Sequence, residues 1–291
     1  MLIWSDCIPC ILRMSLGIAR LVMKDEEQVT RFMEDVLEVR FLRGEEWRVT
    51  SPEVIKIVWR KLLEMTGETD PLREVKEEQN TKALRIYPYA KEVIVKSRDP
   101  LLEAVKFAIM GNSIDAMSDV KGGAPEMIIE RYNGFKIRPE DLDYLKERLE
   151  RGRKILYLGD NCGEIIFDRL YIEFLCERLR AEIIFVTRTL PILNDATLQN
   201  ALSVGMEEVA QVMENGAPEP LAGTFLEKIS PELKVLIEES DLIISKGGGN
   251  YDSLTEEEGL RGKVSFLFQA KCHPYCSLHQ VSLGAPILYN F

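Results

Sequence analysis

The sequence contains little histidine, no long hydrophobic run and no excess of basic residues. Among 291 residues there are 2 histidines, and 37 Lys and Arg stand against 48 Asp and Glu, which gives a net charge of −11. Because the acidic residues are spread along the chain, binding to nucleic acid or to an anionic membrane is disfavoured. No segment reaches the roughly 18 apolar residues of a transmembrane helix, and the start lacks the pattern of a secretory signal. We therefore expect a soluble, cytoplasmic protein.

Cysteine is also scarce, since six residues in a chain of 291 are too few for a disulfide scaffold. Their placement is uneven: Cys7 and Cys10 form a C-x-x-C near the start, and Cys272 and Cys276 lie near the end. If these four residues meet in space, they could bind a structural zinc ion or form disulfides, although the spacing is not that of a standard zinc ribbon. Reduced, packed thiols are the third alternative, because free cysteine is often buried.

Apolar residues make up 46% of the chain, which is enough to bury a sizeable core. Before residue 150 they recur every three to four positions, the period of a helix that buries one face, and strand signals are few. Helices are expected at 7–22, 26–39, 52–64, 71–96, 101–110 and 138–151, with Pro88 as a point where the fourth could break. We expect residues 1–150 to form an all-helical domain.

After residue 153 the pattern changes to short apolar runs that alternate with helical segments. Strands are expected at 155–158, 183–186, 209–213, 242–245, 264–268 and 287–289. Alternation of this kind implies right-handed crossovers between neighbouring parallel strands. We therefore predict an α/β fold with a Rossmann-like, mainly parallel, doubly wound sheet in residues 151–291, preceded by the helical domain.

One stretch of this second half joins a strand end to a polar turn. The apolar run 155–158 stops at a glycine, and Asp160 and Asn161 follow it. Gly163 then permits a sharp turn, and a helical pattern begins at Glu164. In open α/β sheets, ligands bind outside the carboxyl ends of the strands. The carboxylate and the carboxamide are therefore candidate ligands for a hard cation or a polar substrate.

Polar residues also follow other predicted elements. Asn194 and Asp195 come after the second strand, Lys246, Gly247, Gly248, Gly249 and Asn250 after the fourth, Lys271 after the fifth, and Asn112 and Asp115 after a predicted helix. Each group alone has a structural explanation: a helix cap, an Asx turn, a solvated lysine, a loose glycine loop or a helix C-terminal turn. Neither G-x-G-x-x-G nor a P-loop motif is present, so the glycines alone are weak evidence for nucleotide binding.

Together the groups favour a functional site. Asp160, Asn161 and Asp195 supply, at adjacent strand ends, the oxygen ligands that Mg²⁺ or Mn²⁺ prefers. Lysines and exposed glycine amides complement phosphate oxygens. The combination points to phosphate-ester chemistry.

The ordered set of motifs resembles the damage-control phosphatase family, long catalogued as domain of unknown function 89, and most of all its archaeal-type members with an N-terminal C-x-x-C. The motifs are Cys7-Ile-Pro-Cys10, Asp99-Pro-Leu with Gly111-Asn112-Ser-Ile-Asp115, Leu158-Gly-Asp160-Asn161-Cys-Gly-Glu164, Asn194-Asp195-Ala, Lys246-Gly-Gly-Gly-Asn250-Tyr251 and Ala270-Lys271-Cys272. They span nearly the whole chain in order.

The resemblance implies a divalent-metal-dependent phosphatase, using Mg, Mn, Co or Ni, that acts on small phosphorylated metabolites such as sugar phosphates. Asp160, Asn161 and Asp195 match the metal-binding positions of the family. The positions that match its substrate-site motifs are Lys246, Asn250, Lys271, Asn112 and Asp115. Oligomeric state is left open.

For the mechanism, we expect water to be the nucleophile, with Asp160 or Glu164 assisting its deprotonation, while covalent attack by Asp160 stays open. Lys246, Lys271 and the amides of Gly247, Gly248 and Gly249 would stabilise charge on the phosphate oxygens. Two other functions compete: a non-catalytic protein that binds or senses a phosphometabolite, and an S-adenosylmethionine-dependent methyltransferase. A methyltransferase is compatible with a Rossmann-like sheet, but methyl transfer does not explain why residues typical of metal ligands cluster at the strand ends.

Overall fold

The computed structural model describes residues 1–111, 132 and 134–291, so the predicted substrate residues Asn112 and Asp115 lie outside the described residues. The described helices are α1 (Cys7–Val22), α2 (Glu26–Leu37), α3 (Ser51–Thr66), α4 (Arg73–Lys96), α5 (Pro100–Gly111), α7 (Pro139–Arg151), α8 (Glu164–Cys176), α9 (Leu198–Ser203), α10 (Pro231–Glu239), α11 (Gly247–Leu254) and α12 (His273–His279). The strands are β1 (Lys154–Leu158), β2 (Glu182–Thr187), β3 (Gln211–Glu214), β4 (Leu242–Lys246), β5 (Val264–Gln269) and β6 (Pro286–Asn290).

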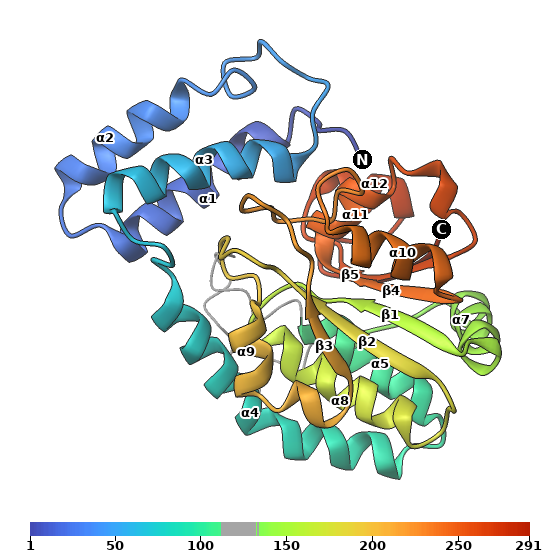
Figure 1. The fold of residues 1–291 in the computed structure, drawn as a ribbon. Helices are drawn as coiled ribbons and strands as arrows, with labels where there is room; N and C mark the ends of the chain where they lie inside the picture. The colour runs from blue at the N-terminus through green and yellow to red at the C-terminus, as the bar shows by residue number, and fades with distance from the viewer. Residues whose placement is uncertain (112–131, 133) are drawn as a thin grey trace.

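The strands form one sheet in the order β3-β2-β1-β4-β5-β6 (Figure 1). Neighbouring strands from β3 to β5 run parallel, and β6 runs antiparallel to β5. The chain moves outward from β1 to β3, returns to β4 beside β1, and then moves outward in the other direction. The carboxyl ends of β1 and β4 therefore meet at the switch point, where open α/β sheets bind their ligands. The predicted α/β, mainly parallel fold is confirmed.

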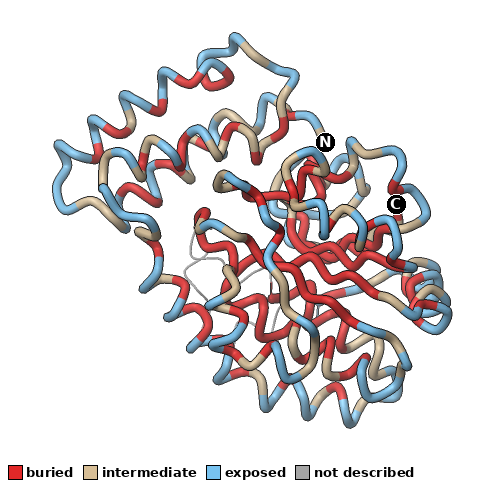
Figure 2. The backbone as a smooth tube through the Cα atoms, viewed as in Figure 1, coloured by how far each residue is buried: buried red, intermediate tan, exposed pale blue. Residues whose placement is uncertain are grey.

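Both faces of the sheet are covered by helices. Ile155 and Tyr157 of β1 belong to a core that contains side chains of α4, α5 and α8, whereas Leu156 and Leu158 belong to a second core with side chains of α10, α11 and α12. Successive residues of a strand point to opposite faces, so a strand buried on both faces reads as a continuous apolar run. Figure 2 shows the sheet as the most continuously buried part of the backbone.

Helices α1, α2 and α3 enclose a third core around Phe32 and Trp59. It connects to the sheet side of the molecule, because the indole Nε1 of Trp59 donates to the carbonyl of Pro191 at 2.9 Å. The predicted division near residue 150 stays a prediction, but the cores cross it: Ile86 of α4 and Phe107 of α5 pack in the same core as β1.

Local sequence signals explain several helix ends. The capping box of Thr50 and Glu53 starts α3, and Gly67, with φ of +70°, ends it in the left-handed region. Helix α4 continues through Pro88 rather than breaking there. None of the described helices combines the length and the apolar character needed to cross a membrane.

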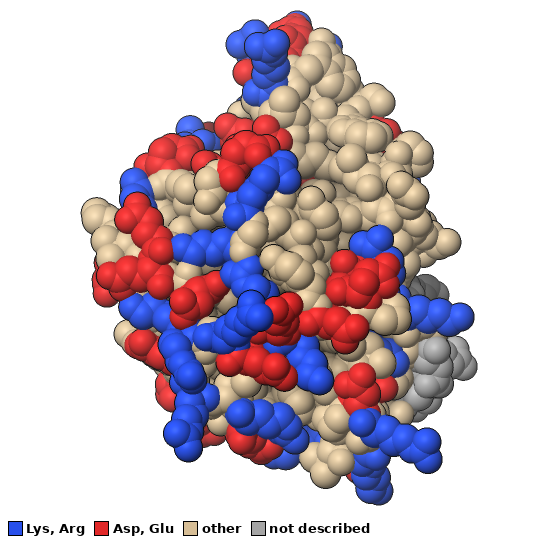
Figure 3. Space-filling model, turned by 90° about the vertical axis from the view of Figure 1, so that its right-hand side faces the viewer, with Lys and Arg blue, Asp and Glu red and all other residues tan. Residues whose placement is uncertain are grey.

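The face drawn in Figure 3 carries acidic and basic side chains interspersed over much of its area. Among the exposed ion pairs of the protein is Arg261 with Glu258. Exposed pairs of this kind keep a surface solvated and add little stability.

Candidate active site

The three predicted metal ligands lie side by side at the carboxyl end of β1. The backbone of residues 160–162 pairs with the backbone of residues 194–196. The amide of Ala196 donates to the carbonyl of Asp160 at 2.8 Å, and the amide of Cys162 donates to the carbonyl of Asn194 at 2.9 Å. Asn161 and Asp195 form an isolated bridge between these segments. The side chains of Asp160, Asn161 and Asp195 are all at least nine-tenths buried. Two stretches distant in sequence are thus brought together by backbone pairing.

The carboxylate of Asp195 does not cap the following helix. Helix α9 begins at Leu198, and Thr197 caps it in a capping box with Asn200. The alternative that Asn194 or Asp195 serves only as a helix cap is therefore wrong. Likewise, α8 begins after Gly163, with φ of +79°, and has no side-chain cap, while the Nδ2 of Asn161 donates to Asp160 at 2.6 Å.

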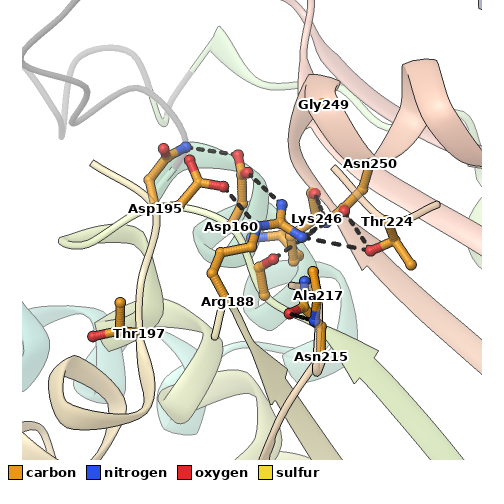
Figure 4. Close-up of polar contacts among 12 residues, drawn as sticks. Asp160, Arg188, Asp195, Thr197, Asn215, Ala217, Thr224, Lys246, Gly249 and Asn250 are labelled. Atoms are coloured by element: carbon orange, nitrogen blue, oxygen red, sulfur yellow. Dashed lines mark hydrogen bonds and ion pairs between the residues drawn. The ribbon is translucent and has the colours of Figure 1, made fainter. Parts of the chain in front are cut away.

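A buried arginine, Arg188, lies between the two carboxylates (Figure 4). Its Nε donates to Oδ2 of Asp195 at 2.7 Å, and its Nη2 is 3.6 Å from Oδ1 of Asp160. Its Nη1 donates to Oδ1 of Asn250 at 3.1 Å, whereas Nη2 makes no hydrogen bond to any of the described residues. Sequence reasoning assigned no role to Arg188, although Arg188 directly follows the last residue of β2, and a polar residue at a strand end was the signal that could have found it.

The electrostatics of the site suit a bound cation. Burial, and then the negative charges of Asp195 and Glu164, raise the pKa of Asp160 well above its usual range, while Arg188 and Lys271 act in the opposite direction. Two buried carboxylates that repel each other are stabilised by a positive charge between them. Arg188 supplies part of that charge.

Beneath Asp160, Lys246 and Glu164 belong to a fully buried network. The ammonium of Lys246 donates to the carbonyl of Ala108 at 2.8 Å, to Asp168 at 2.6 Å and to Glu164. All three N–H groups of Lys246 are thus taken by protein oxygens, so the alternative of a solvated lysine is wrong here. The hydroxyl of Tyr157 completes the network by donating to Asp168 at 2.6 Å.

The charges in this network are buried, and one ammonium, that of Lys246, pairs with the two carboxylates of Glu164 and Asp168. Burial lowers the pKa of Lys246, but the attraction of Asp168 and Glu164 outweighs it and the pKa is raised. Burial raises the pKa of Asp168 to about 7, with the ammonium of Lys246 opposing that rise. Lys246 therefore contacts the predicted metal ligands only indirectly. It donates to Glu164, whose Oε2 also accepts a hydrogen bond from Nδ2 of Asn161 at 3.2 Å.

The three glycines after β4 form the first turn of α11 instead of a loose loop. Gly247 has a φ of +78°, and a Cβ there would lie 1.8 Å from Oδ2 of Asp160. A Cβ at Gly249 would lie 1.8 Å from the carbonyl of Ala222. Only glycine satisfies both the conformation at Gly247 and the close approach to the carboxylate.

Asn250 and Lys271 occupy different settings. Asn250 is buried, and its Nδ2 donates to the carbonyls of Lys246 at 2.8 Å and of Gly159 at 3.2 Å, while its Oδ1 accepts from Arg188 and Thr224. Asn250 therefore links the carboxyl ends of β1 and β4 to Arg188. Lys271 follows β5 and is exposed to solvent. Its positive charge opposes the rise in the pKa of Asp160, so it lies near that carboxylate.

The residues fit an oxygen-ligated divalent cation but not a preformed zinc site. Among the described residues, no group of three or more His, Cys, Asp and Glu is placed to hold a metal ion. The set at the strand ends has two carboxylates, Asp160 and Asp195, and the amide of Asn161, which suits a cation that keeps several waters. All six cysteines are free thiols, including Cys7, Cys10, Cys272 and Cys276, so the disulfide alternative is not realised in this structure.

Residues 3–287 match the family described as the damage-control phosphatase ARMT1-like domain. The chain is 31% identical to a damage-control phosphatase of Archaeoglobus fulgidus over 96% of this chain and 95% of that one. It is 32% identical to an uncharacterized protein of Methanocaldococcus jannaschii over 97% of this chain and 93% of the other.

A solved structure shows the same fold. The crystal structure of a protein of the domain of unknown function 89 family from Pyrococcus horikoshii covers 100% of both chains, with a TM-score of 0.86 and 27% sequence identity. The ordered motifs, the sheet topology and the family match agree. The chain belongs to the damage-control phosphatase ARMT1-like domain family.

Proposed function

We propose that the protein is a divalent-metal-dependent phosphatase that hydrolyses phosphate esters of small metabolites. The family membership and the names of the Archaeoglobus and Pyrococcus relatives, both damage-control phosphatases, support the reaction class. The observation that carries the proposal is the convergence of Asp160, Asn161 and Asp195 at the switch point of the sheet.

Asp160, Asn161 and Asp195 would hold the cation. When bound, the ion supplies positive charge that neutralises the phosphate and polarises its oxygens. The repulsion between the two buried carboxylates supports this assignment, because a cation relieves it. Arg188 holds Asp195 in position and keeps the pair oriented.

The phosphate oxygens would face the start of α11. The first amides of a helix have no partner within the helix and favour an anion, and α11 begins at Gly247, which lies beside the carboxylate of Asp160. The guanidinium of Arg188, whose Nη2 has no hydrogen-bond partner in the part of the chain that the structure describes, adds positive charge on that side. The ammonium of the exposed Lys271 adds more.

The attack on phosphorus is assigned to water, with Asp160 as the carboxylate that accepts its proton. Glu164 is less suited to this step, because Lys246 and Asn161 donate to its two oxygens. Glu164 and Lys246 instead act as positioning residues that fix Asn161 and the strand end. The assignment of a small phosphorylated metabolite as substrate rests on the family and not on the shape of the site.

Release of inorganic phosphate from a panel of sugar phosphates tests the proposal, with Mg²⁺, Mn²⁺, Co²⁺ or Ni²⁺ added singly and with EDTA as the comparison. We expect turnover with at least one metal and its loss in EDTA. Asp195→Asn should lower kcat/KM by roughly 100-fold or more, because it removes a charge from the cation site. Asp143→Asn, at an exposed position of α7, is the matched control and should retain full activity.

Two results would contradict the proposal. Phosphate release that is equal with and without EDTA would remove the metal from the mechanism. Full activity in Asp195→Asn, with metal present and the fold intact by circular dichroism, would remove the assigned ligand set. Binding of sugar phosphates without turnover under any metal would instead favour a sensing protein.

A further inference from the structure

The start of α1 and the start of α12 share a small cavity outside the strand-end site. This cavity, of about 160 Å³, is lined by three of the six cysteines, Cys7, Cys10 and Cys272, and also by Tyr275 and the buried Asp252. Cys7 and Cys10 lie in the first turns of α1, and Cys272 is the N-cap of α12. Residues more than 260 positions apart in the chain therefore face one space.

Independent contacts hold these two segments together. The Nδ1 of His273 is 3.6 Å from Oδ1 of Asp6, and the rings of Trp4 and His273 pack edge to face at 6.3 Å. Figure 1 likewise places the N-terminus beside α12. The approach of the cysteines is thus built into the packing and does not depend on a single side chain.

We propose that Cys10 and Cys272 form a site of disulfide formation that links α1 to the turn between β5 and α12. Cys10 is exposed and Cys272 is half-buried, so a small oxidant reaches Cys10 first. Cys10 and Cys7 lie near enough to Cys272 that their negative charges, after burial, add to the raised pKa of the Cys272 thiol. Cys276 does not line the cavity.

The reaction needs a low-molecular-weight disulfide such as oxidised glutathione. The thiolate of Cys10 attacks one of its sulfurs and releases one glutathione thiolate, which leaves a mixed disulfide on Cys10. The thiolate of Cys272 then attacks the sulfur of Cys10 and releases the second glutathione. Two protein thiols are oxidised and one glutathione disulfide is reduced, and the two protons that the protein thiols lose pass through solvent to the two glutathione thiolates, which become thiols.

The surroundings favour persistence of the bond over rapid exchange. Burial raises the pKa of the Cys10 thiol, although the charge of Arg13 opposes the rise, and burial raises the pKa of the Cys272 thiol to about 12. A thiol with a high pKa is a poor leaving group, so reduction of its disulfide is slow. The link would tie together the two ends of the chain next to Lys271, which lines the same cavity.

The test is oxidation of the full chain with oxidised glutathione, followed by alkylation of the remaining thiols and peptide mapping by mass spectrometry. We expect a Cys10–Cys272 peptide and a mass decrease of about 2 Da, from the loss of two hydrogens. The Tm should rise by roughly 5 °C on oxidation and return after dithiothreitol, because the link closes nearly the whole chain.

Three variants sharpen the test. Cys10→Ser and Cys272→Ser should each abolish both the linked peptide and the rise in Tm. Cys176→Ser is the matched control, since Cys176 is exposed but does not line the cavity, and it should behave as the parent chain. Any of three results would overturn the proposal: thiols that stay unlinked after oxidation, a Cys7–Cys10 peptide in place of the Cys10–Cys272 peptide, or one thiol-bound zinc ion per purified chain.

Discussion

The α-carbon of Gly247 lies against the carboxylate of Asp160, so closely that a Cβ on Gly247 would stand 1.8 Å from Oδ2. The φ of Gly247 is +78°, a conformation that other residues adopt only with strain. Gly247→Ala should therefore displace the carboxylate and lower kcat/KM by roughly 100-fold, because a shift of about 1 Å in a catalytic group has that effect. Phosphate release with the best metal measures it.

Gly259→Ala is the control for that substitution. Nothing lies within 4 Å of a Cβ at Gly259, and its φ is not in the left-handed region. Its activity and Tm should match those of the parent chain. Equal activity of Gly247→Ala and Gly259→Ala would show that the approach to Asp160 has no catalytic consequence.

The sequence was sufficient to predict the sheet and the convergence of Asp160 with Asp195. Both depend on strand ends, and apolar runs buried on two faces mark strands clearly. The roles of Lys246 and Arg188 could not be predicted in this way. Whether a lysine or an arginine is solvated or buried depends on which carboxylates the fold brings to it, and Asp168, the partner of Lys246, lies 78 residues away on α8.

The same limit applies to the helical half. Its helices were predicted, but their spacing does not tell which core each helix joins. Helices α4 and α5 pack with α8, whereas α1, α2 and α3 pack in a different core, which also contains Ile192, Leu193 and Ala222. An amphipathic pattern predicts that one face of a helix is buried. It does not predict which other element that face packs against, because this depends on the tertiary structure.

Arg188→Met should destabilise the metal-free protein strongly. The change leaves Asp160 and Asp195 buried without the guanidinium, and breaking a buried ion pair on one side costs about 3–5 kcal/mol. The free energy of unfolding in urea, with EDTA present, measures the loss. Addition of Mg²⁺ should recover part of it, because the cation replaces the missing charge.

Arg151→Met is the control for Arg188→Met. Arg151 is exposed, and its pair with Glu147 at 2.6 Å is a surface contact within α7. Its loss should change the free energy of unfolding by about 0.5 kcal/mol or less. A similar small effect for Arg188→Met would mean that the two carboxylates do not depend on the arginine.

The two buried tyrosines near β1 allow a matched comparison. The hydroxyl of Tyr157 donates to Asp168 at 2.6 Å, whereas the hydroxyl of Tyr171 is buried with no hydrogen-bond partner in residues 1–111, 132 and 134–291. Tyr157→Phe should lower the free energy of unfolding by about 1–2 kcal/mol, since it removes a hydrogen bond to a charged group. Tyr171→Phe should leave it unchanged or raise it. The opposite order in urea denaturation would refute the network around Lys246.

Asp252 makes the stability depend on pH in an unusual direction. Burial raises the pKa of Asp252 to about 6 from 3.8, although the hydrogen bond from Ser51, the N-terminal charge and the hydroxyl of Tyr275 act against the rise. The folded chain therefore binds the proton of Asp252 more tightly than the unfolded chain does. Between about pH 4 and pH 6 this group favours the folded state more as the pH falls, the reverse of a carboxylate held in an ion pair.

The substitution Asp252→Asn isolates this contribution from the other carboxylates, which titrate in the parent chain and the variant alike. A shift of this size corresponds to about 3 kcal/mol when the group is fully ionised, and about 2 kcal/mol of it should be relieved between about pH 7 and pH 4.5. Urea denaturation of both proteins at both pH values gives the double difference. We expect the parent chain to gain stability relative to Asp252→Asn on acidification. A parent chain that instead loses stability relative to the variant would place the charged form of Asp252 in a favourable setting and contradict the assignment.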